Sequence, residues 1–369
     1  MPFDTGNISC RIFDIDEPID ASVIDELAVH VVAPIETLDG PEPITGWVSP
    51  RHLLDRDISR ESCLRGNFAC ANLLKAELKI PRSLLTAHCK MEELAEMEAR
   101  GVPYLNRQTR ADIKKRVVDE LLPKMPPTLT AISMAIDLSR RRIYTDAMSA
   151  KQHDAFCAAF RKATRLTANE IIPESAALRL HGIDTQGLPV QCFSPDPEVE
   201  SAANSVGMDF LMWLWFFCET RGGLFKTAPD AAEFAAMLEG PAVFLLEGEG
   251  AHEISLRRGM PLVSREARTT VESGKKLRSV KLTLARGKET YTATIDGLDF
   301  AFRGLVLPKP ETPYEPEEAF VERMNGVQTY TDAVFHLYGM FLKERIAPKT
   351  WKKTMDEIKD WIKTRPAYI

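Results

Sequence analysis

This 369-residue chain lacks several of the patterns that mark enzymes and membrane proteins. It contains no Gly-x-Gly-x-x-Gly sequence, no phosphate-loop signature and no Gly-x-Ser-x-Gly motif, which excludes the commonest nucleotide-binding and hydrolase fingerprints. Its longest dense apolar run, from Phe210 to Cys218, is too short to cross a bilayer. The chain is therefore expected to be soluble, with no cofactor and no membrane partner.

Paired cysteines are also missing. The seven cysteines form no Cys-x-x-Cys pair, and the N-terminus has no basic stretch followed by an apolar one. An odd, unpatterned set of this kind is typical of reduced, buried thiols rather than of disulfides or a metal knuckle. The sequence thus predicts a cytoplasmic protein without a signal peptide, a disulfide framework or a cysteine-bound metal.

Candidate catalytic groups are equally sparse. The nearest acidic constellation is Asp14, Asp16 and Glu17, and a metal-dependent nuclease would need such carboxylates to converge with others on one or two ions. The sequence offers no partner cluster, so this trio is interpreted as a solvated strand end. The aromatic run from Trp213 to Phe217 would point to all sides of a helix, which favours a role in the core over base stacking. No catalytic residue and no metal ligand is predicted, and the chain is not expected to be an enzyme.

Charge is distributed unevenly along the chain, whose net charge is −6. Residues 1–62 carry four basic and 13 acidic side chains, and residues 170–250 carry three and 13. By contrast, residues 100–124 carry seven basic and three acidic side chains, residues 140–165 seven and two, and residues 257–288 ten and two. Such segregation gives an acidic body a local positive surface, which favours contact with a phosphate backbone. A merely solvated face is the alternative interpretation of each cluster taken singly.

Hydrophobic periodicity indicates an α+β fold. A helical period begins at Pro81 and, after a break, resumes at Thr109, where the spacing to Asp112 resembles a capping box. This predicts a helical hairpin inserted between strands, while prolines and glycines over residues 40–50 predict a loop. The predicted strands are 7–15, 67–78, 129–137, 142–146, 242–247, 253–257, 277–285, 290–296 and 300–307, and the predicted helices are 21–32, 150–164, 201–221 and 264–273, with a helical region from 316 onward.

These elements group into four predicted regions. In the third of them, Val280 and Leu282 alternate with Ser279 and Lys281, so its sheet is expected to have one wet face. The regions are a central α+β domain of residues 1–80 and 124–168, an inserted helical hairpin at 81–123 that forms a tip, a second α+β domain at 169–310 with mixed or antiparallel strands, and C-terminal helices at 311–369.

A series of short motifs resembles the RdgC family in content and in order. The residues that carry the resemblance are Gly46–Pro50, the strand 67–78 with Ile80-Pro81, the hairpin, Leu121-Leu122-Pro123, Asp146–Lys151 with the helix after it, Arg257-Arg258, and Glu272–Lys275 before a meander. The resemblance runs over roughly residues 7–346, and residues 347–369 are an extension beyond it.

The resemblance implies a protein without enzymatic activity that forms a head-to-tail homodimeric ring. Duplex DNA would pass through the positively lined hole, and binding would restrain a RecA-type recombinase on the nucleoid. Lys124 falls where the family has a basic residue, and Arg257 and Arg258 fall on its basic pair before the meander. One departure is Pro126-Pro127, where the family often has an aromatic residue. If that aromatic residue helps to close the ring, closure must differ in this chain.

The sequence as a whole predicts nonspecific binding of double-stranded DNA. Clusters of Arg and Lys without a base-reading motif supply the salt-sensitive, sequence-independent part of such binding. A metal-dependent nuclease or nuclease subunit and a scaffold that binds only protein are the alternatives. The residues expected to contact DNA are Lys115, Arg116, Lys124, Arg257, Arg258, Lys275, Lys276, Arg278 and Lys281.

Overall fold

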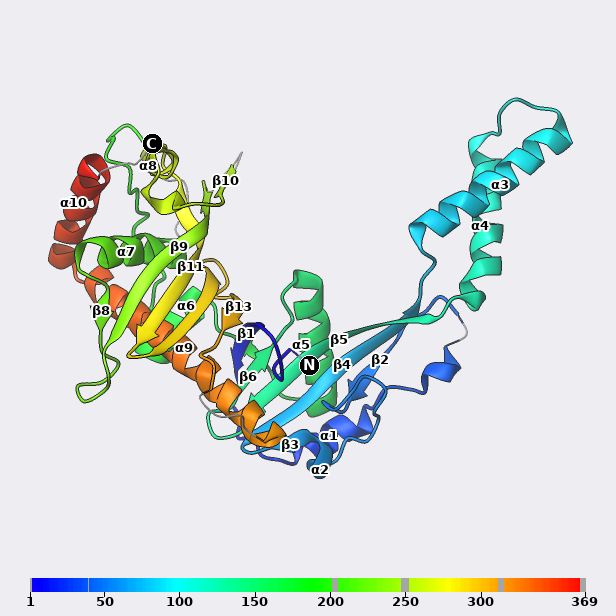
Figure 1. The fold of residues 1–369 in the computed structure, drawn as a ribbon, viewed down its shortest axis with the longest axis horizontal. Coiled ribbons are helices and arrows are strands. Elements are labelled where there is room, and N and C mark those ends of the chain that lie inside the picture. Colours follow the sequence, from blue (N-terminus) through cyan, green and yellow to red (C-terminus); the bar gives the residue numbers. More distant parts are fainter. Residues whose placement is uncertain (1, 39, 201–204, 247–251, 311–314, 366–369) are drawn as a thin grey trace.

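The structure, a computed structural model, describes residues 2–38, 40–200, 205–246, 252–310 and 315–365. Its elements form a crescent with two limbs (Figure 1). One limb is a helical hairpin, and the other is a lobe that holds the C-terminal helices and the later strands. A sheet connects the two limbs, and the space between them is the concave side of the crescent.

One continuous antiparallel sheet holds the crescent together. Its central strand is β1 (Ile8–Asp14), which pairs with β13 (Phe302–Val306) on one side and with β6 (Arg142–Thr145) on the other. The strand order is β10-β9-β11-β12-β13-β1-β6-β5-β4-β2, with three short strands off this path. The predicted α+β class and antiparallel pairing are confirmed. Because β1 belongs to both halves, the two predicted α+β domains share a sheet, and their limits stay a prediction.

The remaining elements follow the chain in a simple order. The other strands are β2 (Ile44–Val48), β3 (Leu64–Arg65), β4 (Phe68–Leu78), β5 (Pro127–Asp137), β7 (Asn169–Glu170), β8 (Leu224–Phe225), β9 (Phe234–Leu245), β10 (Glu253–Leu256), β11 (Lys276–Arg286) and β12 (Glu289–Asp296). The α-helices are α1 (Val23–Val29), α2 (Arg60–Cys63), α3 (Arg82–Arg100), α4 (Arg107–Leu121), α5 (Ala150–Thr164), α6 (Pro173–His181), α7 (Val206–Thr220), α8 (Arg265–Glu272), α9 (Pro316–Arg345) and α10 (Pro348–Thr364).

Helix α5 anchors the core of the N-terminal half. It begins at the predicted residue because Ser149 and Gln152 form a capping box, in which each side chain bonds the backbone N–H of the other residue. Its Phe156 lies in the core against Phe13 of β1 and Trp47 of β2, with ring centroids 5.7 and 6.4 Å away. This stack of aromatic rings fixes α5 on the sheet.

The hairpin of α3 and α4 extends from the ribbon made by β4 and β5 (Figure 1). Its small core is formed by the buried Leu105, Ile113, Val117 and Leu121, and α3 contributes no fully buried residue. The limb therefore presents most of its surface to solvent, whereas the rest of the crescent is built on large cores.

The start of α4 differs from the sequence prediction. Asn106 is the N-cap, and its side chain accepts a hydrogen bond from the N–H of Thr109 at 2.8 Å. The predicted capping box of Thr109 and Asp112 is wrong, because an asparagine three residues earlier satisfies the free N–H first.

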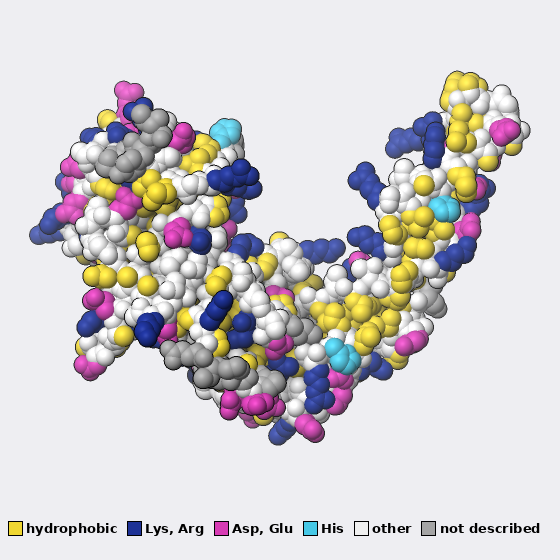
Figure 2. All heavy atoms as spheres, viewed as in Figure 1, with side chains coloured by type: hydrophobic (Ala, Val, Ile, Leu, Met, Phe, Trp, Pro, Cys, Tyr) yellow, Lys and Arg dark blue, Asp and Glu magenta, His cyan; other side chains and the backbone are white. Residues whose placement is uncertain are grey.

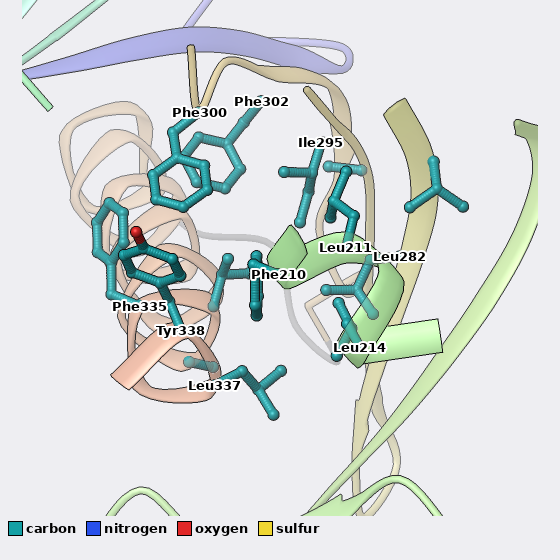
Figure 3. Close-up of a cluster of buried hydrophobic side chains, with 14 of the residues drawn as sticks. Phe210, Leu211, Leu214, Leu282, Ile295, Phe300, Phe302, Phe335, Leu337 and Tyr338 are labelled. Atoms are coloured by element: carbon teal, nitrogen blue, oxygen red, sulfur yellow. The ribbon is translucent and has the colours of Figure 1, made fainter. Parts of the chain in front are cut away.

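The C-terminal lobe has an aromatic core between α7, α9 and the sheet (Figure 3). Phe210 of α7 and Phe300 lie against Tyr338 of α9, with ring centroids 5.2 and 4.9 Å from the tyrosine ring. All side chains from Trp213 to Phe217 are buried, so the predicted core role of this aromatic run is confirmed. Helix α9 covers the sheet as one 30-residue helix, where the sequence indicated only a helical region.

Several elements were not predicted from the sequence, and β2 and α6 are the most informative of them. The predicted loop at 40–50 contains β2, whose Gly46 lies so close to the neighbouring segment that a Cβ would be 2.5 Å from the Cα of Val32. Glycine here permits a close backbone approach and is not a turn signal. Helix α6 was not predicted either, because its nine residues carry too few apolar periods to stand out.

Candidate nucleic-acid interface

Basic side chains gather on the concave side of the crescent. Figure 2 shows Lys and Arg on the inner side of the hairpin limb, at the floor between the limbs and at the edge of the lobe beside β10. Asp and Glu are more frequent on the convex base. The charge segregation read along the sequence is therefore also a segregation in space.

The hairpin carries the first group of predicted contacts. Lys115 is exposed on α4 and has no ion pair with a carboxylate in the described part of the chain. Arg116 bonds Glu92 of α3 at 2.9 Å, and Lys124 bonds Glu120 at 2.8 Å, but both side chains stay about 60% exposed. Exposed pairs of this kind contribute little stability, so these two cations can exchange their partner for a phosphate.

The turn after β10 carries Arg257 and Arg258, which the structure leaves exposed. The Nε–H of Arg257 donates to Ser255 Oγ at 3.1 Å, and neither guanidinium forms an ion pair with a described carboxylate. Arg258 and Gly259 both adopt positive φ, 71° and 64°. Arginine is strained in this region, typically by about 1 kcal/mol, so the surrounding chain imposes the turn.

Strand β11 uses its cations differently. Arg278 bonds Glu253 at 2.8 Å and lies 3.6 Å from Asp296, and Lys281 bonds Glu239 at 2.8 Å. Both side chains are about one-third exposed, so they remain at the surface with their charge partly neutralised. Lys275 is less engaged, since its ammonium group donates only to Ser273 Oγ at 3.2 Å.

Lys276 does not belong to the interface, and its predicted contact with DNA is withdrawn. Its side chain is 3% exposed, and its ammonium group bonds Asp209 at 2.8 Å inside the lobe. Arg345 approaches the same carboxylate at 3.8 Å, and burial raises the pKa of Asp209 against the opposing effect of these two cations. The prediction failed because it grouped Lys276 with its basic neighbours in the sequence, whereas its partner Asp209 lies on α7 and is not close to it along the chain.

Helix α5 adds cations that the sequence analysis counted in a cluster but did not name as contacts. They are Lys151, Arg161, Lys162 and the C-cap residue Arg165, all exposed and without an ion pair to any described carboxylate. Figure 1 shows one end of α5 reaching into the space between the limbs. Exposure and the lack of an ion pair make such cations available to a phosphate, and neither property is visible in a linear sequence.

The acidic residues considered for catalysis are engaged elsewhere. Asp14 accepts from Arg142 at 2.9 Å, and Asp16 pairs with Arg179 at 2.6 Å. Within the described ranges, no three His, Cys, Asp or Glu side chains come together in a way that could hold a metal ion. Nor does any helix there combine the length and apolar character of a membrane span.

The hairpin also exposes apolar surface. Met91 and Leu94 of α3 are 56% and 52% exposed, and Tyr104 in the connection to α4 is 73% exposed. Pro126 and Pro127, where the resemblance led us to look for an aromatic residue, are exposed at the start of β5. The limb thus offers both cations and apolar side chains to a partner.

The fold and its surface define a class: an acidic α+β protein whose concave side is basic. Comparison with known families gives this class a name, because the family model described as "Putative exonuclease, RdgC" matches residues 9–178, from β1 into α6. Over this segment the chain is similar to the RdgC family, and the match supports the resemblance that its motifs indicated. Among curated proteins, none matches the chain.

Proposed function

We propose that the concave side of the crescent binds double-stranded DNA without reading its sequence, in a recombination-associated role on the nucleoid. The observation that carries this proposal is the gathering of exposed Lys and Arg on the concave side of a chain whose net charge is −6 (Figure 2). The match of residues 9–178 to the RdgC family model fits such a role.

The state of the cations supports phosphate contacts in particular. Lys115, Arg257 and Arg258 have no carboxylate partner among the described residues, so binding them to phosphate breaks no internal ion pair. Contacts to the backbone fix a duplex in place but carry no sequence information. Binding of this kind releases counterions and weakens steeply with salt.

We further propose that two copies close around the duplex and that the bound protein restrains a RecA-type recombinase. The exposed Met91, Leu94 and Tyr104 are suited to an apolar contact with a second copy. With Pro126-Pro127 in place of an aromatic residue, closure would rest on such hairpin contacts. Sedimentation equilibrium that gives a monomer at micromolar concentration would contradict the ring but not DNA binding.

Duplex binding is tested by fluorescence anisotropy over a range of salt concentrations. The affinity should fall linearly on a log–log plot, with a slope of about −0.9 for each phosphate contact, and should hardly change between scrambled sequences. A strong preference for one sequence at equal salt would contradict the proposal.

The same samples separate the two rival functions. Incubation with Mg²⁺ followed by electrophoresis should leave both circular and linear duplex intact, and the appearance of cleaved product would favour a nuclease. No salt-dependent binding at all would favour a scaffold that contacts only protein.

A further inference from the structure

We propose that the turn Arg257-Arg258-Gly259-Met260 enters the minor groove of the duplex and presses the Met260 side chain against a base step. This inference rests on the proposed DNA binding and specifies how one part of the surface contacts the duplex. Phosphate contacts alone would require only the two arginines, and the structure adds an apolar side chain between them and the next helix.

Met260 is the first observation. Its side chain is 76% exposed, whereas the two residues after it, Pro261 and Leu262, are buried. Methionine is usually placed in a core, where its flexible side chain fills gaps. Here it stands in solvent, separated from Arg258 only by Gly259, in the segment that follows β10.

The second observation is that the residues that follow the turn anchor it to the lobe. The 3₁₀ helix of Pro261–Val263 follows Met260 at once, and the N–H of Val263 donates to the carbonyl of Met260 at 3.2 Å. Pro261 lies against β9, where a Cβ on Gly240 would come within 2.3 Å of its ring. Met260 thus projects from a fixed base, so its insertion would order little additional chain.

The backbone of the turn is the third observation. Arg258 and Gly259 have φ values of 71° and 64°, so the chain bends at two successive residues outside any helix or strand. A single bent segment of chain, unlike a helix, is the kind of element that the minor groove, about 6 Å wide, can admit. The strained arginine also indicates that the turn geometry is imposed by the fold and not by local preference.

Arginine and methionine have matched roles in this groove. A narrow minor groove concentrates negative potential and attracts guanidinium groups, and proteins that bind there often insert apolar side chains such as methionine between base steps. Arg258, without a partner among the described carboxylates, can supply the first contact and Met260 the second. Binding would then follow groove shape and remain largely independent of sequence.

The test compares Met260→Ala with a matched control, Met237→Ala. Met237 lies on β9 of the same lobe and is 54% exposed, but it has no arginine turn beside it. Met260→Ala should weaken duplex binding by about fivefold while the salt slope stays unchanged, because no phosphate contact is lost. Met237→Ala should leave both quantities at the wild-type value.

A second readout detects insertion directly. Relaxed closed-circular plasmid is saturated with protein, treated with topoisomerase I and freed of protein, so that any unwinding remains as a change in linking number. The wild-type protein should produce this change, and Met260→Ala should reduce it strongly. A minor-groove dye should also compete with the wild-type protein more than with the variant.

The possible outcomes distinguish a failure of the proposed DNA binding from a failure of the minor-groove contact alone. If the wild-type protein shows no salt-dependent duplex binding, the proposed function fails and the inference fails with it. If the wild-type protein binds but Met260→Ala binds and unwinds DNA equally well, only the minor-groove contact is overturned. A variant that keeps its DNA affinity but changes its sedimentation would assign Met260 to a protein contact instead.

Discussion

The turn after β10 and the strand β11 are both rich in basic residues but differ in what those residues do. In the turn, Arg257 and Arg258 are exposed and have no partner among the described carboxylates. In β11, Lys276 is buried with Asp209, and Arg278 and Lys281 are paired with Glu253 and Glu239. The number of basic residues in a segment therefore does not give the number of cations that can bind phosphate. Cations that already form internal ion pairs must be left out of the count.

The largest effect, on the free energy of unfolding, is expected for Lys276, whose charge is paired inside the lobe. Lys276→Ala would leave the carboxylate of Asp209 buried with only Arg345 at 3.8 Å. Removal of one partner from a buried ion pair typically lowers the free energy of unfolding by about 3–5 kcal/mol. Chemical denaturation should show this loss. Lys276→Met, which fills similar volume but also removes the charge, is the control for packing, and a stability change below about 1 kcal/mol in both variants would contradict the role of the pair.

Asp146 gives the opposite case: a half-buried carboxylate that forms no ion pair with a described cation. Burial raises the pKa of Asp146, before α5, to about 6, and the N–H of Ser133 donates to it at 2.6 Å. The folded state holds the proton more tightly than the unfolded state, so stability falls as the pH rises from about 4 to about 6 and is constant above that.

Asp146→Asn should therefore stabilise the protein at neutral pH by at most about 3 kcal/mol, and the gain should vanish below about pH 4. Thermal unfolding of both proteins over this pH range measures the difference. A gain that persists unchanged at acid pH would mean that Asp146 is not the titrating group.

The smaller effects concern DNA binding and compare the two regions directly. Arg257→Ala with Arg258→Ala should lower the salt slope by about one to two units, because free cations are lost. Arg278→Ala with Lys281→Ala removes the same formal charge but should lower the slope by less than about one unit, because each cation is already shared with a carboxylate. Anisotropy titrations of both double variants at several salt concentrations test this order, and equal slopes would show that internal pairing does not limit availability.

Much of the fold could be read from the sequence because its periodic segments are long. The helix at 150–164 is correct to the residue, since Ser149 supplies a capping signal and Phe156 and Phe160 an apolar period. The strand at 67–78 and the meander were found within a residue or two, because β-alternation is strong there. Strand β2 was missed because Gly46 serves a close backbone approach, which a sequence does not distinguish from a turn.

The candidate site could be predicted only as a set of clusters. The exposure of Arg257 follows from its place at a strand end and was expected. The burial of Lys276 depends on its pairing with Asp209 of α7, a contact between distant parts of the chain that the sequence of β11 does not reveal. The pairing of Lys281 with Glu239 joins residues of different strands, so it requires the register of the sheet.

The position of β1 limits which part of the chain could be isolated as a stable fragment. Its Ile8, Cys10 and Ile12 lie in the core of the C-terminal lobe, whereas Phe13 lies in the other core. The family match ends at residue 178, yet a fragment cut there would lose β13 and leave one edge of its own central strand bare. Exposed edges of this kind invite pairing with other chains. The matched segment is thus not a complete sheet by itself, because strands that come after it pair with its own β1.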